Sequence, residues 1–171
     1  AVTELIKSPV INPDGTVTFN IPSYTGEKLY VAGTVEGEDW DGKEIAKNEK
    51  GMFSYTTKNP VAPGKYQYKF KLSNKDWNGS FKDPLNPGTE DNSILIVPGL
   101  VVEAISVQKG VPTSLPTSAT LWDSQGKSTI VTPSYALKEP APTGVTLENG
   151  ILTVDKTFTG NSVDLMASSG H

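Results

Sequence analysis

Apolar side chains in this chain recur at every second position, in short runs. In "TVTFNI", Val17, Phe19 and Ile21 alternate with polar residues, and the runs "KLYVAGTV", "GMFSYTT" and "SILIVPGL" are also rich in strand-forming residues. Such alternation puts successive side chains on opposite faces of a strand, whereas a helix would need an apolar period of 3.6 residues, which no window shows. The pattern predicts an all-β protein.

Turn-forming residues separate the runs at short intervals. "NPDG", "APG" and "NPG" interrupt the first half, and Pro, Gly, Asn and Asp each favour turns. In the second half, "VVEAISVQKG", "SATLWDSQGKSTIV" and "NSVDLMAS" read as strands, and "ENGI" predicts a hairpin with a type I′ turn. Short strands with regular turn signals are typical of a β-sandwich.

The composition of the chain changes near Gly99, because aromatic residues are rarer after this position. We place a domain boundary at about Pro98, which gives residues 1–98 and 99–171. Each part has the size of a small sandwich domain. The sequence therefore predicts two consecutive β-sandwich domains.

The stretch "GKYQYKFKLSNKDWNG" carries the clearest functional signal. Side chains alternate between the two faces of a strand, so we expect one face of this strand in the core: Tyr66, Tyr68, Phe70 and Leu72. We expect the other face to point outward: Lys65, Gln67, Lys69 and Lys71. Trp77 follows the turn among residues that cannot bury it locally. Trp40 lies in a loop, "EGEDWDGKE", beside carboxylates whose burial would be costly.

These two tryptophans allow two interpretations. Trp40 and Trp77 either cover the edge of the sandwich, since tryptophan is often only partly buried, or form platforms for a ligand. A sugar ring has an apolar C–H face that suits a flat indole, and lysine, glutamine and asparagine can bond its hydroxyls. The second interpretation predicts weak sugar binding.

Charge and composition exclude several functions. The net charge is −4 with scattered lysines, which disfavours nucleic acid as a partner. The chain has no cysteine, and its only histidine, His171, is the last residue and is expected to begin a purification tag. These counts exclude disulfides, thiolate sites, a Ser–His–Asp triad and a histidine metal site. No apolar run is long enough for membrane insertion.

An acidic cluster, Glu36, Glu38, Asp39 and Asp41, raises the question of calcium or of a carboxylate pair for glycoside hydrolysis. The spacing lacks the full EF-hand pattern, so we interpret the cluster as a solvated loop and keep calcium as the alternative. We expect no catalytic residues, no metal and no cofactor.

The first half also resembles a known family. "LYVAGT", "PGKYQYKFKL", "DPLNP" and "DNSILIVPG" occur in the order found in the starch- and glycogen-binding modules of carbohydrate-binding family 48, which include accessory modules of bacterial pullulanases. The resemblance covers residues 8–99. It implies that an α-1,4-linked glucan binds to Trp40, Lys69, Trp77 and Asn92. Gln67, on the outward face of the same strand as Lys69, is a further candidate partner.

Two departures from the family pattern affect this site. The loop "GTVEGEDW" is longer than usual and lacks a Phe-Asn pair, which leaves open whether Trp40 approaches Trp77. An insertion, "NGSFK", follows Trp77. Phe81 within it either shapes the site or anchors the loop.

The second half resembles a bacterial immunoglobulin-like domain, most clearly in "GVTLENGILTV". Such domains are commonly spacers in secreted and cell-surface proteins. We expect Met166 in its core and Trp122 in core or edge packing.

Together these observations predict a non-catalytic starch-binding module with an immunoglobulin-like spacer. It would be a monomeric fragment of a larger amylolytic protein that is extracellular or on the bacterial cell surface. It would act in polysaccharide degradation, and glycogen or pullulan are further ligands that the resemblance allows. We interpret "AVTELIKSPV" as a position where a longer chain was cut. The alternatives are a protein-interaction module or a structural spacer that has lost sugar binding.

Overall fold

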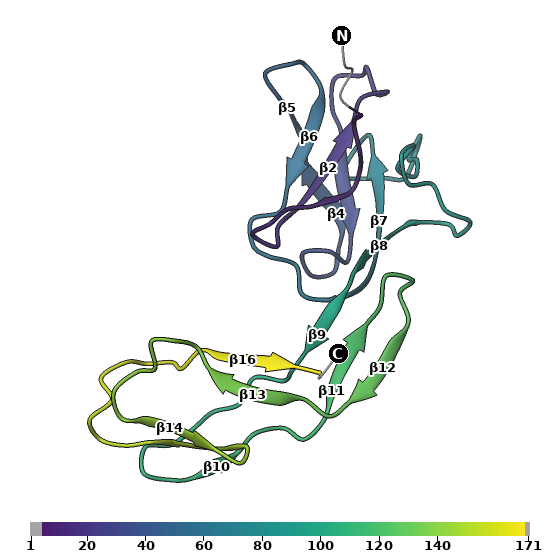
Figure 1. Cartoon of the computed structure of the whole chain (residues 1–171). Helices are drawn as coiled ribbons and strands as arrows, with labels where there is room; N and C mark the ends of the chain where they lie inside the picture. The colour runs from purple at the N-terminus through teal and green to yellow at the C-terminus, as the bar shows by residue number, and fades with distance from the viewer. Residues whose placement is uncertain (1–4, 170–171) are drawn as a thin grey trace. The chain divides into compact units, whose positions relative to one another are not determined.

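The computed structural model describes residues 5–169, and this part of the chain folds into strands and turns without a helix. The all-β prediction is confirmed. The chain divides into two compact units, Ala1–Val97 and Pro98–His171 (Figure 1). His171, the expected tag residue, lies outside the described residues. Within them, no helix is long and apolar enough to cross a membrane.

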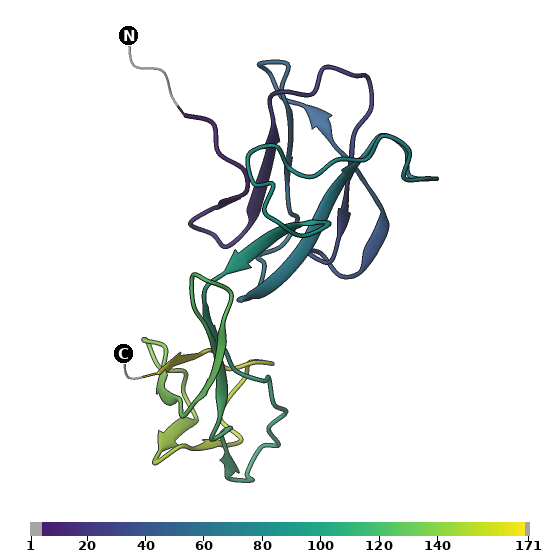
Figure 2. The ribbon, with the colours of Figure 1, turned by 90° about the vertical axis from the view of Figure 1, so that its right-hand side faces the viewer.

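The first unit is a sandwich of two four-stranded antiparallel sheets (Figures 1 and 2). One sheet has the order β1 (Val10–Ile11), β2 (Val17–Ile21), β6 (Phe53–Thr56) and β5 (Ala46–Lys47). The other has the order β4 (Asp39–Glu44), β3 (Tyr30–Gly33), β7 (Gly64–Lys71) and β8 (Ser93–Val97). Side chains from both sheets form a single core.

Strand parity predicts most of this core. Val17, Phe19 and Ile21 of β2 are fully buried, and Tyr68 and Phe70 of β7 meet them from the opposite sheet. The Phe19 and Tyr68 ring centroids lie 4.6 Å apart. Because burial of each large apolar side chain contributes about 1.5 to 3 kcal/mol, these alternating positions fix which face of each sheet turns inward.

The alternation of side chains predicted the wrong exposure for two residues at the end of β7. Leu72 follows the last residue of the strand and is 38% exposed. Lys71, which we expected on an exposed outer face, is only 2% exposed. It does lie on that face, but other side chains cover it.

The "DPLNP" motif supplies a buried polar anchor. The Asp83 carboxylate accepts hydrogen bonds from Ser8 Oγ at 2.6 Å, Tyr68 Oη at 2.8 Å and the Leu85 amide at 2.9 Å. The Asp83 amide in turn donates to Ser93 Oγ at 2.9 Å. Burial, and then the neighbouring Asp83 carboxylate, raise the pKa of Tyr68. The network ties the segment before β8 to the sandwich.

The second unit consists of three small antiparallel sheets. They are β12 (Ser128–Val131), β11 (Ala119–Trp122) and β9 (Gly99–Val101); β10 (Thr113–Ser114), β15 (Ile151–Val154) and β14 (Val145–Glu148); and β13 (Ser134–Leu137) with β16 (Leu165–Ser168). Its core contains Leu115, Val145, Leu152, Val154 and Phe158. The immunoglobulin-like strand order that the resemblance implies is not established by these pairings.

Local predictions in the second unit have mixed outcomes. The "ENGI" hairpin is confirmed, since Asn149 and Gly150 both have positive φ, 51° and 74°, as a type I′ turn requires. Residues 102–107 are not a strand, although we expected "VVEAISV" to continue as one. Met166 is 61% exposed, so its expected core position was wrong: its neighbour Leu165 faces the core instead. Trp122 is partly buried in β11.

Candidate ligand-binding site

The outer face of β7 presents polar side chains between the core positions. Lys69 pairs with Ala32 of β3, and Gln67 pairs with Ile94 of β8. Gly33, the last residue of "YVAG", allows the close approach of β3, because a Cβ there would lie 2.1 Å from the Gln67 carbonyl oxygen. The glycine of this motif therefore lets β3 pair closely with β7 beneath the site.

Trp40 lies in an irregular part of β4 rather than in the loop that the sequence predicted. Val31 of β3 pairs with Lys43, and Gly33 pairs with Asp39. The chain advances two residues along β3 between these pairs but four along β4, so β4 contains extra residues that bulge out of the sheet. The Asp39 carboxylate accepts a hydrogen bond from the Gly42 amide at 3.0 Å and closes this bulge. Bulges redirect side chains, and this one carries Trp40.

Glu36 anchors the loop that precedes Trp40. Its carboxylate forms an ion pair with Lys43 and accepts hydrogen bonds from Tyr55 Oη at 2.8 Å and the Lys58 amide at 3.0 Å. Burial alone would raise the pKa of Glu36, but the bonds from Lys43, Tyr55 and Lys58 together hold it below its ordinary value. Burial and the Glu36 carboxylate raise the pKa of Tyr55.

The solvated-loop interpretation is therefore wrong for Glu36. Glu38 and Asp41 are exposed, and Asp39 is half-buried in the bulge. Among residues 5–169, no group of three or more acidic, histidine or cysteine side chains could hold a metal ion. The calcium alternative gains no support from this arrangement.

Trp77 lies in the loop that follows β7. Phe81 closes it by exchanging two backbone hydrogen bonds of 2.9 Å with Phe70. The Phe81 ring lies 5.7 Å from the ring centroids of both Phe70 and Tyr24. Phe81 therefore anchors the loop, which decides between its two predicted roles. Trp77 itself remains 45% exposed.

Trp40, Lys69, Trp77 and Asn92 line one shallow, open depression of about 330 Å³. The two indole centroids are 6.1 Å apart, and the ring planes meet at 52°. The bulge in β4 thus brings Trp40 close to Trp77. Four of the five predicted site residues form a single surface, which we call the indole depression.

Gln67, the fifth predicted residue, is exposed beside the indole depression. Asn92 Nδ2 donates to Gln67 Oε1 at 2.9 Å, which orients both amides. This bond uses one donor of Asn92 and one acceptor of Gln67. The pair still carries a donor and an acceptor for another polar group.

Sequence reasoning missed Lys71 as a component of this site. Lys71 Nζ donates to the Trp40 carbonyl at 2.8 Å and lies 4.2 Å from the Trp77 ring centroid. A signal was present: Lys71 shares the outer face of β7 with Lys69 and is closer in sequence to Trp77. The alternation of side chains along one strand could not reveal that the Trp40 carbonyl and the Trp77 ring contact the Lys71 ammonium.

The indole depression combines two angled aromatic rings with an amine and an amide. It can stack against apolar faces and donate hydrogen bonds to hydroxyl groups. None of its four lining side chains is a carboxylate, so they cannot supply the acid and nucleophile of glycoside hydrolysis.

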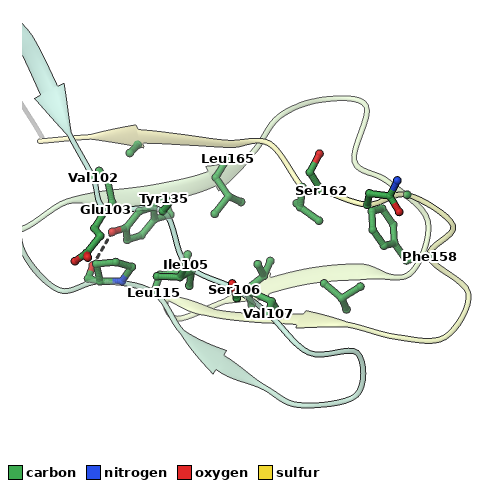
Figure 3. Close-up of a pocket in the computed structure, with 18 of the residues that line it drawn as sticks. Val102, Glu103, Ile105, Ser106, Val107, Leu115, Tyr135, Phe158, Ser162 and Leu165 are labelled. Carbon is green, nitrogen blue, oxygen red and sulfur yellow. Dashed lines mark hydrogen bonds between the residues drawn. The ribbon is translucent and has the colours of Figure 1, made fainter. Parts of the chain in front are cut away.

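A second cavity, of about 660 Å³, lies in the second unit (Figure 3). Apolar side chains such as Leu115, Phe158 and Leu165 line much of it. Two of its polar groups are engaged with the backbone, since Tyr135 Oη donates to the Pro116 carbonyl at 2.6 Å and Lys109 Nζ donates to the Phe158 carbonyl at 2.9 Å. The cavity is an extension of the apolar core, and the indole depression is the better candidate site.

No protein-family model matches this chain, and a search of curated proteins found no match. The functional interpretation therefore depends on the geometry of the indole depression and on the sequence motifs that build it.

Proposed function

We propose that the first unit is a non-catalytic binding module for α-1,4-linked glucans such as starch and maltooligosaccharides. The observation that carries the proposal is the pair of indoles, Trp40 and Trp77, with centroids 6.1 Å apart and planes at 52°. Lys69 and Asn92 line the same depression.

The angle between the rings favours a curved ligand. Each indole can stack on the C–H face of one sugar ring, so two tilted rings match a chain whose consecutive sugars turn. An α-1,4-linked glucan curves in this way, whereas a β-1,4-linked chain is flat. The sugar hydroxyls would then accept hydrogen bonds from Lys69 and form hydrogen bonds in either direction with the amides of Asn92 and Gln67.

Binding of this kind is weak for a single chain. Aromatic stacking contributes roughly 1 kcal/mol per ring beyond the area buried, and association has an entropic cost. A dissociation constant on the order of micromolar to millimolar follows. Glycogen and pullulan contain the same linkage and are further candidate ligands.

The exposure of Trp77 supports this proposal over a purely structural spacer. For a spacer we expect both loop tryptophans to be buried. Trp77 is 45% exposed and faces a depression lined by polar donors. The protein-interaction alternative predicts a macromolecular partner instead of starch.

The wider setting is part of the proposal. We infer from the sequence resemblances that the binding module and its spacer belong to a secreted or cell-surface amylolytic protein. The module would hold substrate near an enzyme during polysaccharide degradation. In that setting the module itself performs no chemistry.

Adsorption to insoluble starch tests the proposed function. We expect the protein to leave the supernatant with starch, and Trp77→Ala to stay in it because one platform is gone. Trp122→Phe is the matched control, since Trp122 belongs to the second unit. It should bind like the parent protein. A parent protein that remains in the supernatant would favour the interaction module.

A further inference from the structure

We propose that Lys71 is a positioning residue that sets the angle between the two indoles of the indole depression. The part of this inference that concerns sugar affinity rests on the proposed function. The part that concerns ring geometry does not, because it follows from contacts within the protein.

Lys71 is a buried cation whose partners are the backbone carbonyl of Trp40 and the ring of Trp77. It is 2% exposed, its Nζ donates to the Trp40 carbonyl at 2.8 Å, and its Nζ lies 4.2 Å from the Trp77 ring centroid. Within residues 5–169 the ion pairs are Lys28 with Glu44 and Lys43 with Glu36, so no carboxylate is paired with Lys71.

A buried ammonium group without a carboxylate is costly unless other groups replace its hydration. Here a carbonyl oxygen and the electron-rich face of an indole replace it, and tryptophan is the best aromatic partner for a cation. If the Trp77 ring rotated away, the ammonium would lose one of these partners. The orientation of Trp77 is therefore coupled to the position of Lys71.

This one side chain connects separate parts of the first unit. Lys71 ends β7, and Trp40 lies on β4, with β3 between them in the sheet. Trp77 belongs to the loop after β7. Because Lys71 bonds the Trp40 backbone carbonyl and lies over the Trp77 ring, it holds the Trp77 ring relative to the segment that carries Trp40. Separate contacts of each tryptophan with the sandwich would not do this.

Lys71 and Lys69 have different roles despite sharing a face. Lys69 lines the indole depression, whereas Lys71 lies against one face of the Trp77 ring and is almost inaccessible. A ligand can touch Lys69 but not the Lys71 ammonium. Lys71 therefore acts on the ligand only through the rings.

The test uses three substitutions of Lys71 in the full chain. Lys71→Met removes the charge at similar length, Lys71→Gln keeps a hydrogen-bond donor without the charge, and Lys71→Arg keeps a cation that stacks well on aromatic faces. Lys65→Met is the matched control, because Lys65 is on the same face of β7 but exposed. Thermal unfolding first identifies the variants that fold.

The first measurement is the exciton signal of the paired indoles in circular dichroism, recorded without sugar. Indoles 6.1 Å apart at 52° couple, and the signal depends on the angle between them. We expect Lys71→Met and Lys71→Gln to reduce it, and Lys71→Arg and Lys65→Met to retain it. An unchanged signal in a folded Met or Gln variant would overturn the inference.

The second measurement is maltoheptaose affinity in the same variants. We expect about a tenfold loss in Lys71→Met and recovery in Lys71→Arg. If affinity falls while the exciton signal is unchanged, Lys71 contacts the sugar and the positioning role is wrong. If the signal changes as expected but the parent protein binds no maltoheptaose, the positioning role stands and the glucan-binding proposal fails.

Discussion

At the scale of single residues, the candidate site depends on a few polar groups placed beneath and beside aromatic ones. Parity along β7 was enough to predict that Lys69 and Gln67 point outward, and the structure brings Lys69 into the indole depression. The burial of Lys71 was not predictable in the same way. It depends on Trp40 and Trp77, which come from other segments, and a single strand pattern contains no information about them.

Glu36 gives a prediction at the same scale. Its folded-state pKa lies below the ordinary glutamate value of 4.5, because Lys43, Tyr55 and the Lys58 amide bond its ionised form. The stability that it contributes is therefore fully present above that value and is lost as pH falls through the lowered pKa. We expect the thermal midpoint of the parent protein to fall more steeply with acidification than that of Glu36→Gln.

Glu38→Gln is the control for this effect, since Glu38 is an exposed carboxylate of the same loop. Its acid dependence should match the parent protein. The same pH slope in Glu36→Gln and the parent would show that Glu36 does not stabilise the loop through its charge.

At the scale of elements, local patterns predicted the regular parts of the fold and missed the irregular ones. The alternation in β2 and the Asn149–Gly150 turn follow from short-range rules and are confirmed. The bulge that carries Trp40 depends on the register between β3 and β4, which is a property of two strands. For the same reason, apolar residues in 102–107 did not guarantee a strand: a strand also needs a neighbour with which to pair.

The Asp83 network yields a prediction about these connections. Asp83→Ala would leave the buried hydroxyl donors of Ser8 and Tyr68, and the partly buried Leu85 amide, without their acceptor. We expect the free energy of unfolding to fall by about 2 to 4 kcal/mol. Denaturant titration measures this change directly.

Asp91→Ala serves as the comparison, because Asp91 is exposed in the same segment before β8. It should change stability by less than about 0.5 kcal/mol. Equal stability of the Asp83 and Asp91 variants would contradict the anchoring role of the "DPLNP" motif.

At the scale of the whole molecule, the two units differ in what their surfaces offer. The first is a sandwich of two sheets that displays angled indoles and polar donors on an outer face. The second has short sheets around a largely apolar cavity. Under the proposed function, ligand recognition would belong to the first unit.

Calorimetric titration with maltoheptaose, set beside cellohexaose, tests this account most directly. The bent pair formed by Trp40 and Trp77 predicts measurable binding of the curved α-1,4 chain, on the order of micromolar to millimolar. It predicts at least about tenfold weaker binding of the flat β-1,4 chain, since that chain can stack on only one ring at a time. Absence of binding to maltoheptaose, or equal affinity for the two sugars, would contradict the central claim.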